Sequence, residues 1–401
     1  MTVLSMLLVL AAGSPVSVAN GFDQTVQGAD STYGCLICHA DKRRAFRQGV
    51  HSDRGIRCDD CHGGDPTAVE TQSAHSRGFL GTPSKAQTVT LCSSCHGDPD
   101  QMRQFGLSAD QLAEFRTSRH GALLLGAGNT DAPTCTDCHD AHTILRPEDA
   151  RSKVHPHNIP MTCSNCHDDE QAMAKYGLPT NQLELYRASA HGVAVFERDN
   201  FAAPTCVGCH GSHAALPPTV TEIANVCERC HQLLGREFAR GPHGEAGGLQ
   251  GCLGCHGNHE TARTPANEIA ALCTNCHEGG SSADSLGQEI ESHVVHAESE
   301  LESAAHAIDE LVRMGRSADD ARARYRAALT DFRQMAQVQH SLDLELLEDL
   351  ELRVASATGL VHEQAEVAAE EQWEHKLLLL PLWFFVFSGV VLALFRLREV
   401  R

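Results

Sequence analysis

Aromatic side chains are scarce in this sequence. Phe, Tyr and Trp make up 5% of its 401 residues, with two Trp and four Tyr. Burial of apolar surface is the main favourable contribution to folding, so a chain this poor in large apolar side chains can build only a thin core from them. Runs that favour β-strands are nearly absent as well. The sequence predicts a mainly α-helical protein with extensive loop, whose interior needs material other than side chains.

Positive charge is also in short supply. The chain has 32 Lys and Arg against 52 Asp and Glu, a formal net charge of −20. Such a surface repels nucleic acid and favours cationic partners, with an association that weakens as salt rises. We therefore expect no nucleic-acid partner.

The N-terminus lacks the basic residues that usually open a secretory signal peptide, since the first Lys or Arg is Lys42. It nevertheless has a short apolar segment, Leu4 to Ala12, followed by Ser17-Val18-Ala19, which fits a small-x-small cleavage site. We interpret residues 1–19 as a signal peptide that directs export.

Cysteine occurs in one pattern only. All 18 cysteines lie in nine Cys-x-x-Cys-His signatures. The cysteine pairs are Cys35 and Cys38, Cys58 and Cys61, Cys92 and Cys95, Cys135 and Cys138, Cys163 and Cys166, Cys206 and Cys209, Cys227 and Cys230, Cys252 and Cys255, and Cys273 and Cys276. The histidines that follow them are His39, His62, His96, His139, His167, His210, His231, His256 and His277.

This signature is typical of c-type haem attachment, in which two thiols form thioethers to the haem and the adjacent imidazole becomes the proximal iron ligand. Disulfides and zinc sites also use closely spaced cysteines, but neither requires a histidine directly after each pair. The sequence therefore predicts nine covalently bound haem c groups. Residues 35–277 offer only 27 residues for each signature, so we expect the haems to pack on one another and serve as the core, and the apoprotein to be unfolded.

An internal repeat of 71 residues runs through this region, with copies at 92–162 and 163–233. The shift maps His120-Gly121 onto His191-Gly192 and Ala132–Cys135 onto Ala203–Cys206. A shortened third copy follows, and the first segment is more divergent. We expect the haem-binding domain to span residues 20–283.

The other histidines are the candidates for the sixth ligand of each haem iron. The repeat favours His120, His191 and His243, each followed by Gly, and His142, His213 and His259, each three residues after a signature histidine. His51 and His75 flank the second signature and complete the predicted set. His155, His157, His293 and His296 remain alternatives for the last haem, and Met102, Met161 and Met173 are sulfur alternatives. We expect His306, His340 and His362 to be surface or packing residues.

Residues 284–376 contain no signature and follow a helical pattern. Ile290, Val294, Ala297, Leu301, Ala304, Ile308 and Leu311 alternate spacings of four and three, which predicts a heptad seam. Because a single helix would leave this stripe exposed, we expect a three-helix bundle or a coiled coil between copies of the chain, forming a stalk or a docking surface.

The last apolar segment, residues 377–395, holds 19 consecutive uncharged residues and as a helix reaches about 29 Å, enough for a bilayer. Arg396, Arg398 and Arg401 follow it, which predicts a cytoplasmic tail at 396–401 and a haem domain on the periplasmic side of the cytoplasmic membrane. The span has no His or Cys, so it cannot carry electrons across the bilayer.

With its repeated signatures, the Cys-His-Gly-Gly-Asp-Pro segment at 61–66 and its Cys-His-x-x-His placements, the chain resembles the cytochrome c3-like and doubled-CxxCH groups of multihaem c-type cytochromes of bacterial respiration. It is more distantly similar to membrane-anchored quinol-dehydrogenase cytochromes. The resemblance implies an electron-transfer protein with two histidines on each haem iron and haems arranged as a chain. It also implies redox partners: a membrane oxidoreductase or quinol-linked complex and an extracytoplasmic acceptor.

The alternative function is that of an enzyme similar to hydroxylamine oxidoreductase or multihaem nitrite reductase, with one haem open to substrate. Tyr325 lies in the C-terminal helical region, where the hydroxylamine enzymes place a haem-linked tyrosine. No signature carries Lys in place of His, as one class of nitrite reductase does. We expect no catalytic residue and favour electron transfer.

Overall fold

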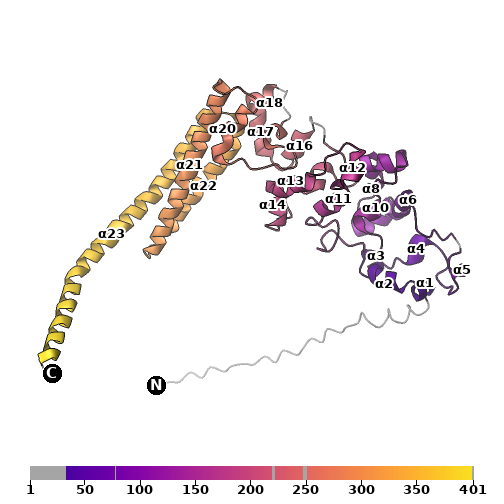
Figure 1. The fold of residues 1–401 in the computed structure, drawn as a ribbon, viewed down its shortest axis with the longest axis horizontal. Coiled ribbons are helices and arrows are strands. Elements are labelled where there is room, and N and C mark those ends of the chain that lie inside the picture. The colour runs from indigo at the N-terminus through magenta and orange to yellow at the C-terminus, as the bar shows by residue number, and fades with distance from the viewer. Residues whose placement is uncertain (1–32, 77, 219–221, 247–250, 400–401) are drawn as a thin grey trace, which may run out of the picture. The chain divides into compact units, whose positions relative to one another are not determined.

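The computed structural model describes residues 33–76, 78–218, 222–246 and 251–399. The expected signal peptide, residues 1–19, lies outside the described residues. Within the described ranges every regular element is a helix or a single helical turn, joined by loops (Figure 1), which confirms the mainly α-helical fold.

The chain divides into two compact units. The first comprises Met1–Cys166 with Gly211–Leu216, and the second comprises His167–His210 with Pro217–Arg401. The helices of the first unit are α1 (Gly34–Cys38), α2 (Ala40–Phe46), α3 (Val50–Asp53), α4 (Cys58–His62), α5 (Thr71–Ala74), α6 (Lys85–His96), α7 (Pro99–Met102), η2 (Arg103–Phe105), α8 (Gln111–Thr117), α9 (Arg119–Gly121), η3 (Ala122–Gly126) and α10 (Cys135–His139). Helix α11 (Ile159–His167) ends at the boundary between the units.

The second unit continues with two groups of helices. The first group is α12 (Glu170–Ala174), α13 (Gln182–Ala188), α14 (Ala190–Phe196), α15 (Cys206–His210), α16 (Ile223–Glu228), α17 (Gln232–Arg240), α18 (Pro242–Ala246), α19 (Leu253–His256), η4 (Ala266–Glu268) and α20 (Ile269–Thr274). The second group is α21 (Ser282–Arg313), α22 (Asp319–Val338), η5 (Gln339–Ser341) and α23 (Leu344–Glu399). Helices α8 and α13 lie at equivalent positions of the 71-residue repeat.

Several signatures form one helical turn because their own residues cap it. In α4 the Asp60 carboxylate accepts a 2.7 Å hydrogen bond from the backbone N–H of Arg57, and in α10 Asp137 does the same for Thr134, also at 2.7 Å. A helical turn brings residues three apart onto one face. The two cysteines of such a signature therefore point toward the same side.

The long helices α21, α22 and α23 run alongside one another and form a three-helix bundle (Figure 1). All seven residues of the predicted seam on α21, from Ile290 to Leu311, are buried. The first four pack with Met335 on α22 and Leu350 on α23, and the last three with Ala321 on α22 and Val361 on α23. Helix α21 ends at Arg313, two residues before Gly315, whose φ of 72° suits the turn into α22. The bundle alternative of the sequence interpretation is thus the observed one.

Apolar burial is unevenly distributed between the two parts of the sequence. In the described part of residues 33–277, eight apolar side chains are buried: Val89, Met102, Leu124, Ala132, Met173, Tyr186, Val195 and Ile223. The described part of 282–399 buries 19. The bundle therefore has a core of side chains, whereas the longer signature region has hardly any.

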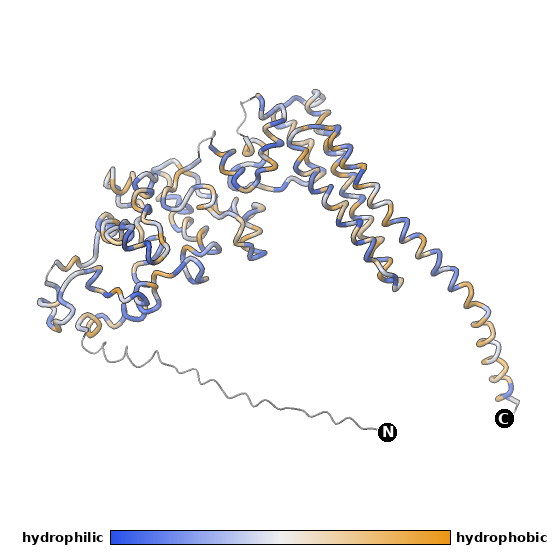
Figure 2. The backbone as a smooth tube through the Cα atoms, turned by 180° about the vertical axis from the view of Figure 1, so that it is seen from behind, coloured by the Kyte–Doolittle hydropathy of each residue, from blue (hydrophilic) through white to orange (hydrophobic). Residues whose placement is uncertain are grey.

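The C-terminal part of α23 is apolar and exposed. The helix is long and apolar enough to cross a membrane, and none of its most apolar window is buried. Figure 2 shows a hydrophobic stretch at this end, preceded by a hydrophilic one. Trp383 and Phe385 are 67% and 77% exposed. An exposed apolar surface of this kind fits a lipid environment.

Replacing Leu350 should loosen the bundle. This side chain is 0% exposed, so Leu350→Ala removes packed apolar contacts and leaves a cavity, at an expected cost of about 2–5 kcal/mol. Leu352→Ala is the matched control, because Leu352 is 63% exposed and should change stability by less than about 0.5 kcal/mol. Hydrogen exchange of peptides from α21–α23 in the detergent-solubilised protein measures both. Equal effects of the two substitutions would contradict the packing.

Candidate haem sites

Eight of the signature histidines each face a second imidazole in their own unit. In the first unit the ring centres lie 6.3 Å apart for His39 and His75, 6.0 Å for His51 and His96, 6.2 Å for His62 and His142, and 6.2 Å for His139 and His213. In the second unit the values are 6.1 Å for His191 and His231, 5.9 Å for His210 and His259, 6.2 Å for His243 and His277, and 6.1 Å for His256 and His340.

This distance fits one metal ion between two imidazoles. A metal–nitrogen distance of about 2 Å on each side, with about 1 Å from each nitrogen to its ring centre, separates two ring centres by about 6 Å. A structural zinc site takes four protein ligands. In the described part of the chain no group of three or more His, Cys, Asp or Glu side chains is placed to hold a metal ion. Two axial imidazoles with two cysteines beside one of them suit haem iron.

Hydrogen bonds fix the orientation of several of these rings. Nδ1 of His62 donates to the carbonyl of Gly81 at 2.9 Å, and Nδ1 of His256 donates to that of Ala262 at 3.3 Å. The nitrogen that a histidine uses for a metal is set by the hydrogen bond that its other nitrogen makes. In both rings Nε2 therefore carries the lone pair, which leaves it as the ligating atom.

Burial favours the neutral form of several of the paired imidazoles. It is the main cause that lowers the pKa of His51 and His191, and the facing imidazole lowers each pKa further. Burial likewise lowers the pKa of His96, His139, His142 and His259. Neutral imidazole is the form that binds metal.

In both copies of the repeat, a serine caps the N-terminus of the helical turn that carries a predicted ligand histidine. The hydroxyl of Ser118 accepts a 2.9 Å hydrogen bond from the N–H of Gly121, and Ser189 does the same for Gly192, also at 2.9 Å. A Cβ on Gly192 would lie 1.9 Å from the carbonyl oxygen of Tyr186, so only glycine fits there. This arrangement fixes the position of His191, and that of His120 in the first unit.

A backbone hydrogen bond recurs between two kinds of segment. One lies just before a predicted ligand histidine, and the other lies just after a histidine of a Cys-His-x-x-His segment. The N–H of Val50, just before His51, donates to the carbonyl of Ile144 at 2.8 Å. The same bond runs from Arg119 to Ala215 at 3.1 Å and from Ala190 to Thr261 at 3.4 Å. Ile144, Ala215 and Thr261 each lie two residues after His142, His213 or His259. The segments that carry the two kinds of histidine are therefore docked in the same way each time.

Consecutive signatures of the first unit are neighbours. Before the first signature, the Tyr33 hydroxyl accepts a 3.0 Å hydrogen bond from the N–H of Cys58 in the second. Burial raises the pKa of Cys61, and Asp60 and then Cys95 of the third signature raise it further. Lys85 of α6 pairs with Asp137 in the fourth signature at 3.4 Å. Cys166 of the fifth signature is likewise close enough to contribute to the raised pKa of Cys138, which burial dominates.

The second unit continues this order. Burial and then His210 lower the pKa of His167, so the fifth and sixth signatures lie close together. Arg229 of the seventh signature donates to the carbonyl of Gly208 in the sixth at 2.9 Å. The thiols of Cys227 and Cys252 lie next to each other, which joins the seventh and eighth signatures. The pKa of Cys255, raised mainly by burial, is raised further by Cys273 and Cys276 of the ninth.

All 18 cysteines are partly or fully exposed. They are therefore accessible for thioether formation. A thiol pair and an imidazole from one short segment, faced by a second imidazole, define a c-type cytochrome with several haems.

Comparison with known proteins supports this class. Residues 50–168 match the sequence model of the family described as Cytochrome c3. The chain is a multihaem c-type cytochrome, and its cofactor is covalently bound haem c. No curated protein and no solved structure matches the chain.

The structure brings together most of the residues that the sequence singled out. Seven of the eight predicted sixth ligands face a signature histidine: His51, His75, His142, His191, His213, His243 and His259. His120 holds the same place in the repeat as His191. The sulfur alternatives Met102 and Met173 are buried at equivalent positions of the repeat, and Met161 is exposed.

His340 was missed by the sequence interpretation, which expected a surface or packing residue. The structure instead places its imidazole opposite His256.

The remaining candidates have other surroundings. His293 and His296 of α21 both hydrogen-bond to Glu351 of α23, the former at 2.5 Å. Burial alone would raise the pKa of Glu351, but these hydrogen bonds outweigh it and lower the pKa. His155 is buried and its Nδ1 accepts from the N–H of His157 at 3.3 Å. Tyr325 packs against the core of the bundle.

Gly192→Ala should disrupt the turn that carries His191. The added methyl group would meet the carbonyl of Tyr186, so we expect loss of hydrogen-exchange protection in residues 182–196. Gly126→Ala is the control, because a Cβ there meets no atom within 4 Å and φ is not positive. Normal protection in the Gly192→Ala protein would show that the turn tolerates a side chain and would refute this explanation of the glycine.

Proposed function

We propose that this protein is a membrane-anchored nonahaem cytochrome c that carries electrons between a membrane oxidoreductase or quinol-linked complex and extracytoplasmic acceptors. The observation that carries the proposal is the pairing of signature histidines with second imidazoles, together with the contacts between consecutive signatures. Bound haem c supplies one-electron redox chemistry, and the chain supplies its ligands and spacing.

The paired imidazoles argue for transfer of electrons rather than chemistry on a substrate. Two histidines that both bound one haem iron would leave no open position for a substrate. Eight of the proposed second ligands are those predicted from the sequence, with His120 assigned from its place in the repeat, and His340 faces the remaining signature histidine, His256. Tyr325 belongs to the bundle core, which gives the hydroxylamine-oxidising alternative no support.

The order of the signatures supports conduction along the chain. Each signature lies next to its neighbours in sequence within each unit, from the first to the fifth and from the fifth to the ninth. Groups attached to neighbouring cysteines are held close together, so an electron need cross only short gaps. No side chain has to react.

The C-terminal part of α23 is the proposed anchor. Residues 377–395 would cross the cytoplasmic membrane, with Arg396 and Arg398 on the cytoplasmic side and the signatures on the periplasmic side. From Leu344 to Leu377 the helix rises by about 50 Å, so its start and its membrane end are far apart. This length favours a partner subunit that delivers electrons from the membrane. The net charge of −20 favours a cationic docking surface on that partner.

The exported full-length protein should carry nine haems, all low-spin in the ferric state, because each iron is held by two imidazoles. Intact-mass measurement gives the haem count, and electronic and low-temperature paramagnetic resonance spectra give the spin state. Added cyanide or nitrite should leave the spectra unchanged. A high-spin band that shifts on addition of either ligand would contradict the proposal and favour the enzyme with an open haem.

Truncation before the apolar segment should release the protein from the membrane. A chain that ends at Glu374 keeps the bundle but lacks residues 377–395, so we expect it in the soluble periplasmic fraction with an unchanged haem spectrum. The control ends at Phe395 and should stay in the membrane fraction. Membrane association of the shorter chain would rule out the span as the only anchor.

A further inference from the structure

The connection between α22 and α23 brings a histidine to the eighth signature. His340 lies in η5, and its ring centre is 6.1 Å from that of His256 with 26° between the ring planes. This geometry matches His139 with His213 and His210 with His259, which are separated by 6.2 Å and 5.9 Å with interplanar angles of 17° and 19°.

Local contacts aim the ring. Nδ1 of His340 donates to the carbonyl of Gln337 at 3.2 Å, so Nε2 carries the lone pair. His256 uses its Nδ1 in the same way with Ala262. Leu342, two residues after His340, has a φ of 59°, which is uncommon for a residue with a side chain. A conformation of this kind persists where the surroundings require it, here at a sharp turn that holds His340 in place.

The surroundings of His340 repeat those of another predicted ligand. A Cβ on Gly49, two residues before His51, would lie 2.9 Å from the carbonyl oxygen of His142. A Cβ on Gly241, two residues before His243, would lie 2.9 Å from the carbonyl oxygen of Ser341 and 3.1 Å from that of His340. The position of His340 relative to His243 therefore resembles that of His142 relative to His51. His340 comes from the helical bundle, however, and not from a Cys-His-x-x-His segment.

The pattern of histidine pairs leaves the eighth signature without a partner of the usual kind, and His340 fills that position. His142, His213 and His259 face the histidines of the second, fourth and sixth signatures. In each case the second histidine follows the signature two places further along the chain. A partner of the same kind for the eighth signature would have to follow a tenth, and the sequence has nine.

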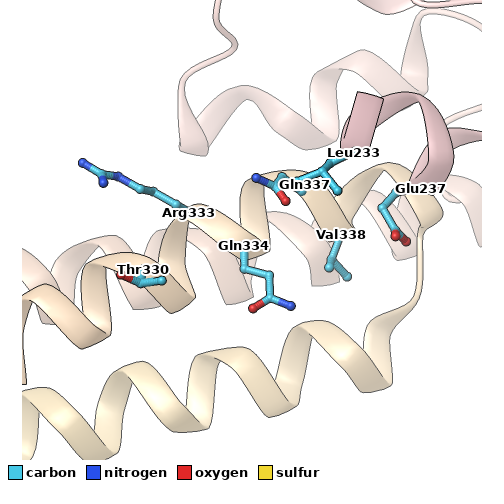
Figure 3. Close-up of a pocket in the computed structure, with 7 residues that line it drawn as sticks. All are labelled: Leu233, Glu237, Thr330, Arg333, Gln334, Gln337 and Val338. Carbon is cyan, nitrogen blue, oxygen red and sulfur yellow. The ribbon is translucent and has the colours of Figure 1, made fainter. Parts of the chain in front are cut away.

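The end of α22 is also held by the signature region. Helix α17 packs against η5 and α22. Figure 3 shows Leu233 and Glu237 of α17 beside the C-terminal half of α22, where they line a groove with Thr330, Arg333, Gln334, Gln337 and Val338. Helix α21 adds a second attachment, because the N–H of Ala270 in α20 donates to the carboxylate of Glu291 at 2.9 Å.

We propose that His340 is the sixth ligand of the haem attached at Cys252 and Cys255, so that an iron ties the helical bundle to the haem region. This inference rests on the proposed function, since it requires bound haem at the eighth signature. A ligand from the bundle makes the anchor and the haem region one mechanical unit at that point. Movement of the bundle would change the environment of this haem first.

His340→Ala in the full-length holoprotein tests the ligand. One of the nine haems should become high-spin and bind cyanide, and added free imidazole should restore the low-spin spectrum. His259→Ala is the positive control, because it removes a sixth ligand of the same series. His306→Ala is the matched negative control, since His306 is an exposed residue of the same bundle and should leave the spectrum as it is.

The outcomes separate the two proposals. A wild-type protein without low-spin haem refutes the proposed function, whereas a low-spin wild type with an unaltered His340→Ala spectrum refutes only the role of His340. If His340→Ala does not yield folded protein, the variant His340→Met tests whether residue 340 is the sixth ligand. It should keep all haems low-spin and raise the reduction potential of one of them, because a methionine ligand raises the potential relative to histidine. Unchanged potentials in a redox titration would overturn the assignment.

Discussion

Two imidazoles held about 6 Å apart form the constraint on which the signature region depends. One comes directly after a cysteine pair and the other from a distant segment, as in His62 with His142 or His139 with His213. An iron that bridges such a pair closes a long loop, and loops that are closed at several points lose much of their freedom in the unfolded state. Successive histidine pairs close overlapping loops of the chain. Each closed loop therefore also fixes a segment that carries a histidine of the next pair.

The two parts of the chain fold by different means. The bundle of α21, α22 and α23 buries a continuous apolar stripe, including Leu311, Met335 and Leu350. The described part of residues 33–277 is longer yet buries few apolar side chains, and its helices are mostly one or two turns long. Helices this short are unstable alone. In the signature region the cofactors must therefore provide both the cross-links and most of the buried apolar surface.

Much of this architecture could be predicted from the sequence, because its strongest patterns are periodic. The spacing of the cysteines identified the signatures, the heptad spacing of Ile290 to Leu311 identified the seam of α21, and the 71-residue repeat led to His191 and His213. The pairing of particular histidines could not be predicted, since partners such as His62 and His142 lie 80 residues apart. The position of His340 opposite His256 could not be predicted because His340 lies outside the repeat. His293 and His296 were alternatives for the last haem, but the packing of α21 on α23 directs them to Glu351.

The central claim is that attached haem replaces a side-chain core in the signature region, while the bundle has its own. Hydrogen exchange of the full-length holoprotein and of a chain with every signature cysteine replaced by serine, both in detergent, tests it most directly. The account predicts that without haem residues 33–277 exchange at the rate of an unfolded chain, while α21, α22 and the first half of α23 stay protected. Protection of 33–277 in the haem-free chain comparable to that of the holoprotein would contradict it.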